Sequence, residues 1–403
     1  MFCILLVLIL TLLIYMYQKF QATQIFTGTE LLEDQLVLIT QKDGTIEAMV
    51  GIEDAGDEVQ NFEGILTPGF INAHCHLELS HMKGMIPAHT GLQEFVKQIV
   101  SLRKVEDAII QQAIVSAEDE MMSNGIVAVG DISNTLDTLT QKAKHNLAYY
   151  SFVELYDLDP TRAADKIIAG LEIQKQFQEN CVRASLVPHA PYSVTNNLWN
   201  LLSAHFGIHT ISMHNQETTD ENDFFKTKSG SFLGMYERTK VNLDFFEATG
   251  LSSLQSVLSV FKNADYGILV HNSFTSALDI QAVHAAMDNA FWCLCPNANQ
   301  YIEQTMPPVE LLRSEKANIV IGTDSYASNW SLSVLDELKT IQEHHPDIPI
   351  SEMLGWATIN GARALQMDKH LGSFEKGKKP GVVLIKGMDA LSGLLNASSH
   401  KIL

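Results

Sequence analysis

The chain has 403 residues, of which 46% are hydrophobic and 18% are charged, and its formal net charge is −20. This composition excludes a disordered chain, and the length is ordinary for a single α/β barrel. The acidic balance argues against binding to a phosphate backbone, so we expect no nucleic-acid partner. Five cysteines without a paired spacing indicate a reducing compartment, and we expect a cytoplasmic protein.

Residues 1–17 form a hydrophobic N-terminal segment, MFCILLVLILTLLIYMY, without a charged side chain. Its length is at the lower limit for a membrane span. It has no basic start and no obvious small-residue cleavage site, unlike a secretory signal. Two interpretations therefore stay open. The segment is a membrane anchor, which would make the membrane a partner, or it is an upstream artefact and translation starts at Met16.

Residues 22–66 resemble a small all-β unit. Strand-like runs at 25–28, 36–39 and 46–50 surround a Lys-Asp-Gly-Thr turn at 42–45. The tail 366–403 returns to strand character with glycine and proline turns, and we expect it to pair with the N-terminal unit. The two terminal segments would then form one small β-sandwich.

Between these segments, strands alternate with amphipathic helical stretches, the pattern of parallel β/α units. Eight strands with intervening helices predict a (β/α)₈ TIM barrel over residues 67–365. We expect the insertion at 215–266 to hold two helices that could cover the barrel mouth, and 351–365 to form a last helix. The predicted barrel strands are 65–73, 126–130, 148–155, 182–188, 209–213, 267–270, 290–294 and 318–322.

Polar residues gather at the C-terminal ends of these strands, where a barrel enzyme builds its active site. The first strand ends in His74-Cys-His76, and residues two apart on a strand face the same side. Two converging imidazoles form half of a metal site. The later strand ends supply the remaining candidates, which are His189, His214, Glu217, His271 and Asp324.

The order His-x-His, His, His-x-x-Glu, His, Asp resembles the amidohydrolase superfamily, in particular its cytosine-deaminase-like and adenosylhomocysteine-deaminase-like members. The likeness covers nearly the whole chain after residue 22, including the lead-in Thr-Pro-Gly-Phe-Ile-Asn-Ala-His at 67–74. The sequence departs from the family at Gly381-Val382, where Ala-Asp is usual. It also has Pro-Asn-Ala-Asn at 296–299 where the family has Pro-x-Ser-Asn.

The resemblance implies one divalent metal ion, preferably zinc, with iron as the other choice. Two-metal relatives bridge their ions through a carboxylated lysine or a glutamate after the fourth strand. This chain has no lysine between Lys175 and Lys226, which excludes the lysine-bridged form. The residues that the resemblance makes metal ligands are His74, His76, His214 and Asp324.

The resemblance also implies catalytic roles for three residues. Asp324 would accept a proton from a metal-activated water, and His271 would orient that water and stabilise the oxyanion. Glu217 would carry a proton to the ring nitrogen and then to the departing amine. His189 has no place among the ligands and is expected to contact substrate. Glu78, on the first barrel loop, is either a second substrate contact or a solvated glutamate.

The expected activity is hydrolysis of a non-peptide C–N bond in a small-molecule substrate. Deamination of a purine-nucleoside-like amine such as adenosylhomocysteine, methylthioadenosine or aminodeoxyfutalosine is favoured. The alternatives are ring-amide opening, as in imidazolonepropionase, dechlorination of a triazine, and a membrane-tethered binding protein without activity. Because dimers are common in the resembled family, a homodimer is also expected.

Overall fold

A computed structural model describes residues 17–33, 35–388 and 393–403 of the chain. The hydrophobic segment predicted at 1–17 lies outside the described residues except for Tyr17. No helix within the described part is both long and apolar enough to cross a membrane.

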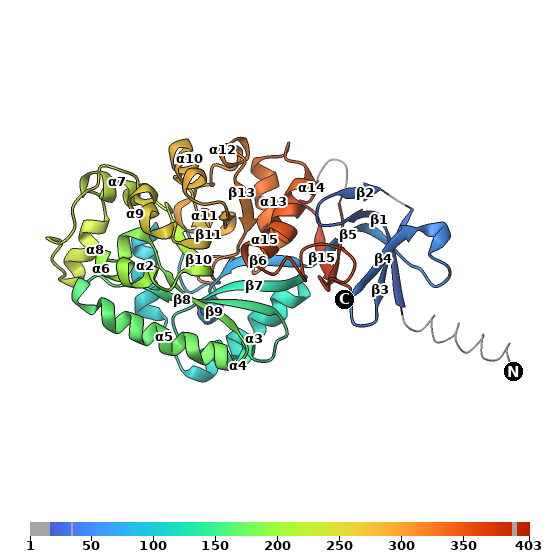
Figure 1. The fold of residues 1–403 in the computed structure, drawn as a ribbon, viewed down its shortest axis with the longest axis horizontal. Helices are drawn as coiled ribbons and strands as arrows, with labels where there is room; N and C mark the ends of the chain where they lie inside the picture. The colour runs from blue at the N-terminus through green and yellow to red at the C-terminus, as the bar shows by residue number, and fades with distance from the viewer. Residues whose placement is uncertain (1–16, 34, 389–392) are drawn as a thin grey trace.

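The two ends of the chain together form one seven-stranded sheet, which lies at one end of the molecule (Figure 1). Its strand order is β15-β14-β5-β1-β3-β4, and β2 pairs with β1. Inward residues such as Phe20, Leu38 and Leu384 give it a separate small core. The prediction that the tail pairs with the N-terminal unit is confirmed. The strands are β1 (Tyr17–Phe26), β2 (Leu31–Glu33), β3 (Leu36–Gln41), β4 (Ile46–Gly51), β5 (Gln60–Pro68), β14 (Val382–Lys386) and β15 (Ser398–Lys401).

The barrel consists of eight parallel strands in two hydrogen-bonded sets of four, β6 to β9 and β10 to β13. Backbone bonds join the sets: the His214 N–H donates to His189 O at 2.8 Å, and the Thr323 N–H donates to His74 O at 3.0 Å. The predicted (β/α)₈ barrel is thus confirmed. Its strands are β6 (Phe70–Cys75), β7 (Ile126–Ser133), β8 (Ala148–Leu155), β9 (Arg183–Pro188), β10 (Gly207–Asn215), β11 (Ala264–His271), β12 (Ala290–Leu294) and β13 (Asn318–Ile321).

The single strand predicted at 65–73 is two strands in the structure. The chain passes from the terminal sheet to the barrel at Gly69, whose N–H donates to Pro380 O at 3.0 Å. A Cβ at this position would lie 2.7 Å from the same oxygen, so only glycine fits the close approach. The first part therefore pairs with β14, and only the second part pairs with β7.

Helices surround the barrel strands. The helix predicted at 351–365 is present as α14, a π-helical turn and α15. The helices are α2 (Leu92–Leu102), α3 (Asp107–Ser123), α4 (Leu139–Lys142), α5 (Ala163–Glu179), α6 (Asn196–Ser203), α10 (Ala277–Ala286), α11 (Pro296–Glu303), α12 (Val309–Ser314), α13 (Val334–His344), α14 (Ile350–Gly355), η5 (Trp356–Asn360) and α15 (Gly361–Ala364). Four short 3₁₀ turns complete the described elements, namely η1 (Ile52–Asp54), η2 (Leu77–Met82), η3 (Pro160–Arg162) and η4 (Pro191–Ser193).

The insertion after β10 holds three helices, so the prediction of two was wrong. They are α7 (Thr219–Thr227), α8 (Phe232–Thr239) and α9 (Ser253–Phe261). Lys228 and Lys240 end the first two helices in the left-handed region, and this splits the segment. These helices lie at the end of the molecule far from the terminal sheet (Figure 1).

Candidate metal centre

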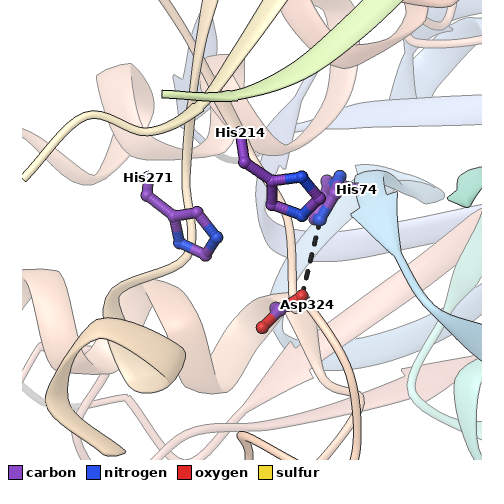
Figure 2. Close-up of side chains that lie close together, drawn as sticks. All are labelled: His74, His214, His271 and Asp324. Atoms are coloured by element: carbon purple, nitrogen blue, oxygen red, sulfur yellow. Dashed lines mark ion pairs between the residues drawn. The ribbon is translucent and has the colours of Figure 1, made fainter. Parts of the chain in front are cut away.

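Four buried side chains from three strand ends meet at the mouth of the barrel. His74 lies on β6, His76 follows directly, His214 lies on β10 and Asp324 follows β13. The His76 and His214 Nε2 atoms are 3.2 Å apart, and Asp324 Oδ1 is 3.4 Å from His74 Nε2 and 3.3 Å from His76 Nε2. Figure 2 shows three of these side chains with His271 beside them. The structure therefore brings the four predicted ligands together.

The donor set suits a divalent cation. Neither ring nitrogen of His74 has a hydrogen-bond partner among the described residues, although both are buried. Such atoms are costly unless something binds them. Burial lowers the pKa of His76 to about 3 and that of His214 well below its usual range. Both imidazoles are therefore neutral at ordinary pH and can offer lone pairs to a metal.

Neighbouring groups fix the orientation of the cluster. His214 Nδ1 donates to His189 O at 2.9 Å, and this bond leaves Nε2 free to face His76. The Ser328 hydroxyl donates to Asp324 Oδ2.

Two residues of the site have an unusual backbone conformation. His271 and Asp324 have φ values of 72° and 56°, in the left-handed region that non-glycine residues rarely adopt. Backbone strain of this kind concentrates at functional sites.

Two further titratable groups lie beside the cluster. His271 Nε2 is 3.7 Å from Glu217 Oε2, and His271 Nδ1 lies 2.8 Å from Asn299 Oδ1. Burial raises the pKa of Glu217 to about 7, against the lowering effect of His271. A carboxyl group with this pKa can both donate and accept a proton near neutral pH.

Asn299, which orients the His271 ring, was not predicted from the sequence. Its position in the Pro-Asn-Ala-Asn sequence at the start of α11 was the available signal, because strand-end residues of a barrel face one common site.

The predicted substrate contacts His189 and Glu78 lie in different places. His189 is half-buried at the end of β9, its ring centroid is 4.8 Å from that of His214, and it lines the cavity described below. Glu78 is buried and does not line that cavity. Its carboxylate accepts hydrogen bonds from Arg103 at 3.0 Å and from the Asn134 and Thr135 N–H groups at 3.0 and 3.1 Å. The solvated alternative for Glu78 was therefore wrong.

A cavity of about 480 Å³ opens from the cluster. His76, His214, Glu217, His271 and Asp324 lie on its polar side. The helices α2 and α8 place Lys97 and Arg238 on the lining, and they also supply most of an apolar wall. Its residues are Leu79, Leu92, Phe95, Val96, Ile99, Phe232 and Met235. This wall could not be predicted from the sequence, since helices from two distant segments build it together.

Comparison with known proteins identifies the class. Residues 65–400 match the amidohydrolase family, so the chain belongs to that family and is a hydrolase. The sequence-based assignment of family, fold and enzyme class is confirmed.

Particular relatives are similar over most of their length. An adenosine deaminase of Helicobacter pylori is 28% identical over 340 residues, covering 80% of this chain and 79% of the relative. The structure of H. pylori aminofutalosine deaminase with methylthio-coformycin has a TM-score of 0.78 at 24% identity, covering 96% of this chain and all of the other. A zinc-bound adenosine deaminase from Xanthomonas campestris has a TM-score of 0.72 at 19% identity, covering 94% and 89% of the two chains.

Proposed function

We propose that this protein is a deaminase with one metal ion that removes the exocyclic amine of a purine nucleoside. The single observation that carries this proposal is the placement of Glu217 and His271. They lie 3.7 Å apart beside the His/Asp cluster and on the wall of the same cavity. A proton-transferring carboxyl group next to a cation site is what hydrolysis of an aromatic amine requires.

In this proposal His74, His76, His214 and Asp324 hold the ion, and zinc is the favoured metal because a deaminase relative binds it. A bound divalent cation supplies Lewis acidity and a nucleophilic water. Asp324 would accept a proton from the attacking water. His271, held by Asn299, stabilises the negative charge that develops as water adds to the ring carbon.

Glu217 completes the reaction in the proposed mechanism. It donates a proton to the ring nitrogen next to the carbon under attack, so the ring can accept the electron pair. As the carboxylate, it then takes the remaining proton of the added hydroxyl group and passes it to the amine, which leaves as ammonia as the C–N bond breaks and the C=O bond forms. Transfer of the proton from Asp324 to Glu217 restores both groups. Its pKa of about 7 suits both steps, because neither protonation state is strongly disfavoured near neutral pH.

The apolar wall supports a nucleoside with a large 5′ substituent. Burial of apolar surface contributes roughly 25 cal/mol per Å², so a substituent packed against Phe95 and Met235 would add to binding. Relatives named for aminofutalosine and for 5-methylthioadenosine and S-adenosylhomocysteine point the same way. We therefore place the expected substrate among 5′-substituted adenosines.

The test measures metal content together with three reactions: ammonia release from 5′-substituted adenosines, adenosine and adenine, ring opening of a ring amide, and chloride release from a chlorotriazine. We expect about one metal ion per chain and the highest kcat/KM for a 5′-substituted adenosine. If only the ring amide or only the chlorotriazine is turned over, the proposal of deamination is wrong and the corresponding alternative reaction takes its place. Metal-free protein without turnover would favour the binding protein.

Two variants separate the proposed roles. His214→Ala should lose the metal, because it removes a nitrogen ligand. Glu217→Gln should keep the metal and lose turnover by about 100-fold or more, since the amide cannot transfer the proton. Glu343→Gln, on the exposed face of α13, is the matched control and should leave both quantities unchanged. Normal turnover by Glu217→Gln would refute its role.

A further inference from the structure

The buried carboxylate of Glu154 has one oxygen without a partner. Glu154 is near the end of β8 and only 6% exposed. Its Oε2 accepts a hydrogen bond from Asn134 Nδ2 at 3.0 Å, but Oε1 accepts none from the described residues. His214 Nδ1 is 3.4 Å from Oε1, yet that N–H already donates to His189 O. An unpaired buried carboxylate oxygen is costly, so a donor from outside the chain is expected to satisfy it.

Glu154 lines the catalytic cavity together with Asn134 and His189. Ligand atoms of Glu154, His189 and His214 lie within 4.8 Å of one another. His189 Nδ1 is engaged by the Ser193 hydroxyl at 2.6 Å, so its second ring nitrogen remains for a ligand. The cavity thus contains a compact polar patch, consisting of Glu154, Asn134 and His189.

This polar patch is separate from the proton-transfer groups. His214, on β10, lies between them, with its ring centroid 4.8 Å from that of His189 on β9 and 5.5 Å from that of His271 on β11. A donor that reaches Glu154 therefore belongs to a part of the substrate beyond the reacting amine. In an adenosine the leaving amine is the only donor of the base, because the sugar replaces the N9–H and the other ring nitrogens carry no hydrogen. The remaining donors are the hydroxyl groups of the sugar.

We propose that Glu154 accepts a hydrogen bond from a ribose hydroxyl of the substrate and makes the enzyme select ribosides over deoxyribosides. This inference rests on the proposed function for the identity of the substrate. Asn134 would hold the carboxylate in place, and Glu78 would hold Asn134 through its backbone N–H. Glu78 then acts on the substrate indirectly, as a positioning residue.

The test compares wild-type protein with Glu154→Gln on adenosine, 2′-deoxyadenosine and 3′-deoxyadenosine. Glutamine keeps the shape and can still accept from Asn134, but it places an amide donor where Oε1 was. We expect wild type to prefer adenosine over one deoxy analogue by about 30-fold or more, because a site built for a hydroxyl rejects the analogue that lacks it. In Glu154→Gln, kcat/KM for adenosine should fall by a similar factor, and that for the deoxy analogue should change less than about threefold.

Metal content and the control variant Glu343→Gln show whether the loss is specific. Equal loss on adenosine and on both deoxy analogues, or loss of metal from Glu154→Gln, would overturn the proposal, because Glu154 would then support His214 or the fold. Unchanged kinetics would also overturn it.

A binding measurement keeps this inference separable from the proposed deamination. Calorimetric titration with inosine and its 2′- and 3′-deoxy analogues needs no turnover. Suppose that wild type deaminates nothing in the panel but binds inosine more tightly than a deoxy analogue, and that Glu154→Gln lacks this preference. Deamination is then wrong and the hydroxyl contact stands. If wild type binds all three equally or binds none, the hydroxyl contact is wrong.

Discussion

Glu217 shows how the surroundings of one residue determine its chemistry. The side chain is buried beside His271, and removal from water raises its pKa to about 7. The same glutamate on the surface would be ionised at neutral pH and would donate no proton. Burial therefore supplies what the proposed role requires, and the pH dependence of the reaction should reveal it.

We predict that kcat/KM falls as pH rises through about 7. The protonated form of Glu217 donates to the ring nitrogen, and its population drops about tenfold for each pH unit above the pKa. Stopped-flow or steady-state rates between pH 5 and 9 would measure this. The residual activity of Glu217→Gln should lack this alkaline limb. An identical limb in the variant would assign the ionisation to another group.

The sequence was sufficient to predict the site residues at the ends of barrel strands. It was not sufficient to predict residues whose role depends on the groups that they contact in the folded protein. Five of the predicted site residues lie at the end of a hydrophobic strand or shortly after it, and barrel strands direct their C-terminal ends to one rim. They are His74, His76, His214, His271 and Asp324. Asn299 and Glu154 also lie near strand ends, after β12 and at the end of β8, but this position does not show which groups they contact. Their roles depend on which atoms lie opposite, and only the three-dimensional structure gives that information.

At the scale of elements, the junction of β13 with β6 holds the first ligand in place. Gly322 directly follows β13, and a Cβ there would lie 2.8 Å from the His74 Cβ, 2.8 Å from Cys293 Sγ and 3.0 Å from Cys295 Sγ. The two cysteines are buried core residues. Without a side chain at Gly322, β13 can approach His74 closely.

We predict that Gly322→Ala destabilises the fold by about 1–3 kcal/mol, since overpacking forces backbone or side chains to move. Because His74 is among the atoms displaced, metal affinity should fall as well. Denaturant unfolding and competition with a chelator would measure the two effects. Gly355→Ala is the matched control: it is helical with nothing within 4 Å of a Cβ, and it should stabilise by about 0.5–1 kcal/mol. Equal effects of the two substitutions would show that the close approach is unimportant.

The elements also show the limits of sequence patterns. Alternating strands and helices were sufficient to predict the barrel. The break at Gly69 and the three helices after β10 were not predicted, for different reasons. Gly69 matters because Pro380, more than 300 positions later, lies against it. The extra helix depends on left-handed lysines at 228 and 240, which the hydrophobic pattern does not mark.

At the scale of the molecule, metal binding should be coupled to stability. The His/Asp cluster joins β6, β10 and β13, so an ion would link both four-stranded halves of the barrel. A ligand present at 1,000 times its Kd stabilises the native state by about 4 kcal/mol. The predictions of a homodimer and of a cytoplasmic location remain predictions.

We predict that a chelator lowers the apparent Tm of metal-loaded wild type by roughly 4–8 °C. Re-addition of zinc should restore it, and differential scanning fluorimetry would show both changes. The control is His214→Ala, whose Tm should not respond to chelator because the ion is already absent. A wild-type Tm that chelation leaves unchanged would mean that no ion contributes to the stability of this barrel.

In the proposed metal centre, three imidazoles and one carboxylate share a single ion. Anomalous diffraction at the zinc edge, from crystals of the metal-loaded protein, would locate that ion. We predict one peak, about 2.0–2.2 Å from Nε2 of His74, His76 and His214 and from a carboxylate oxygen of Asp324. Two peaks about 3.5–4 Å apart, or a peak away from these four residues, would contradict the proposed metal centre.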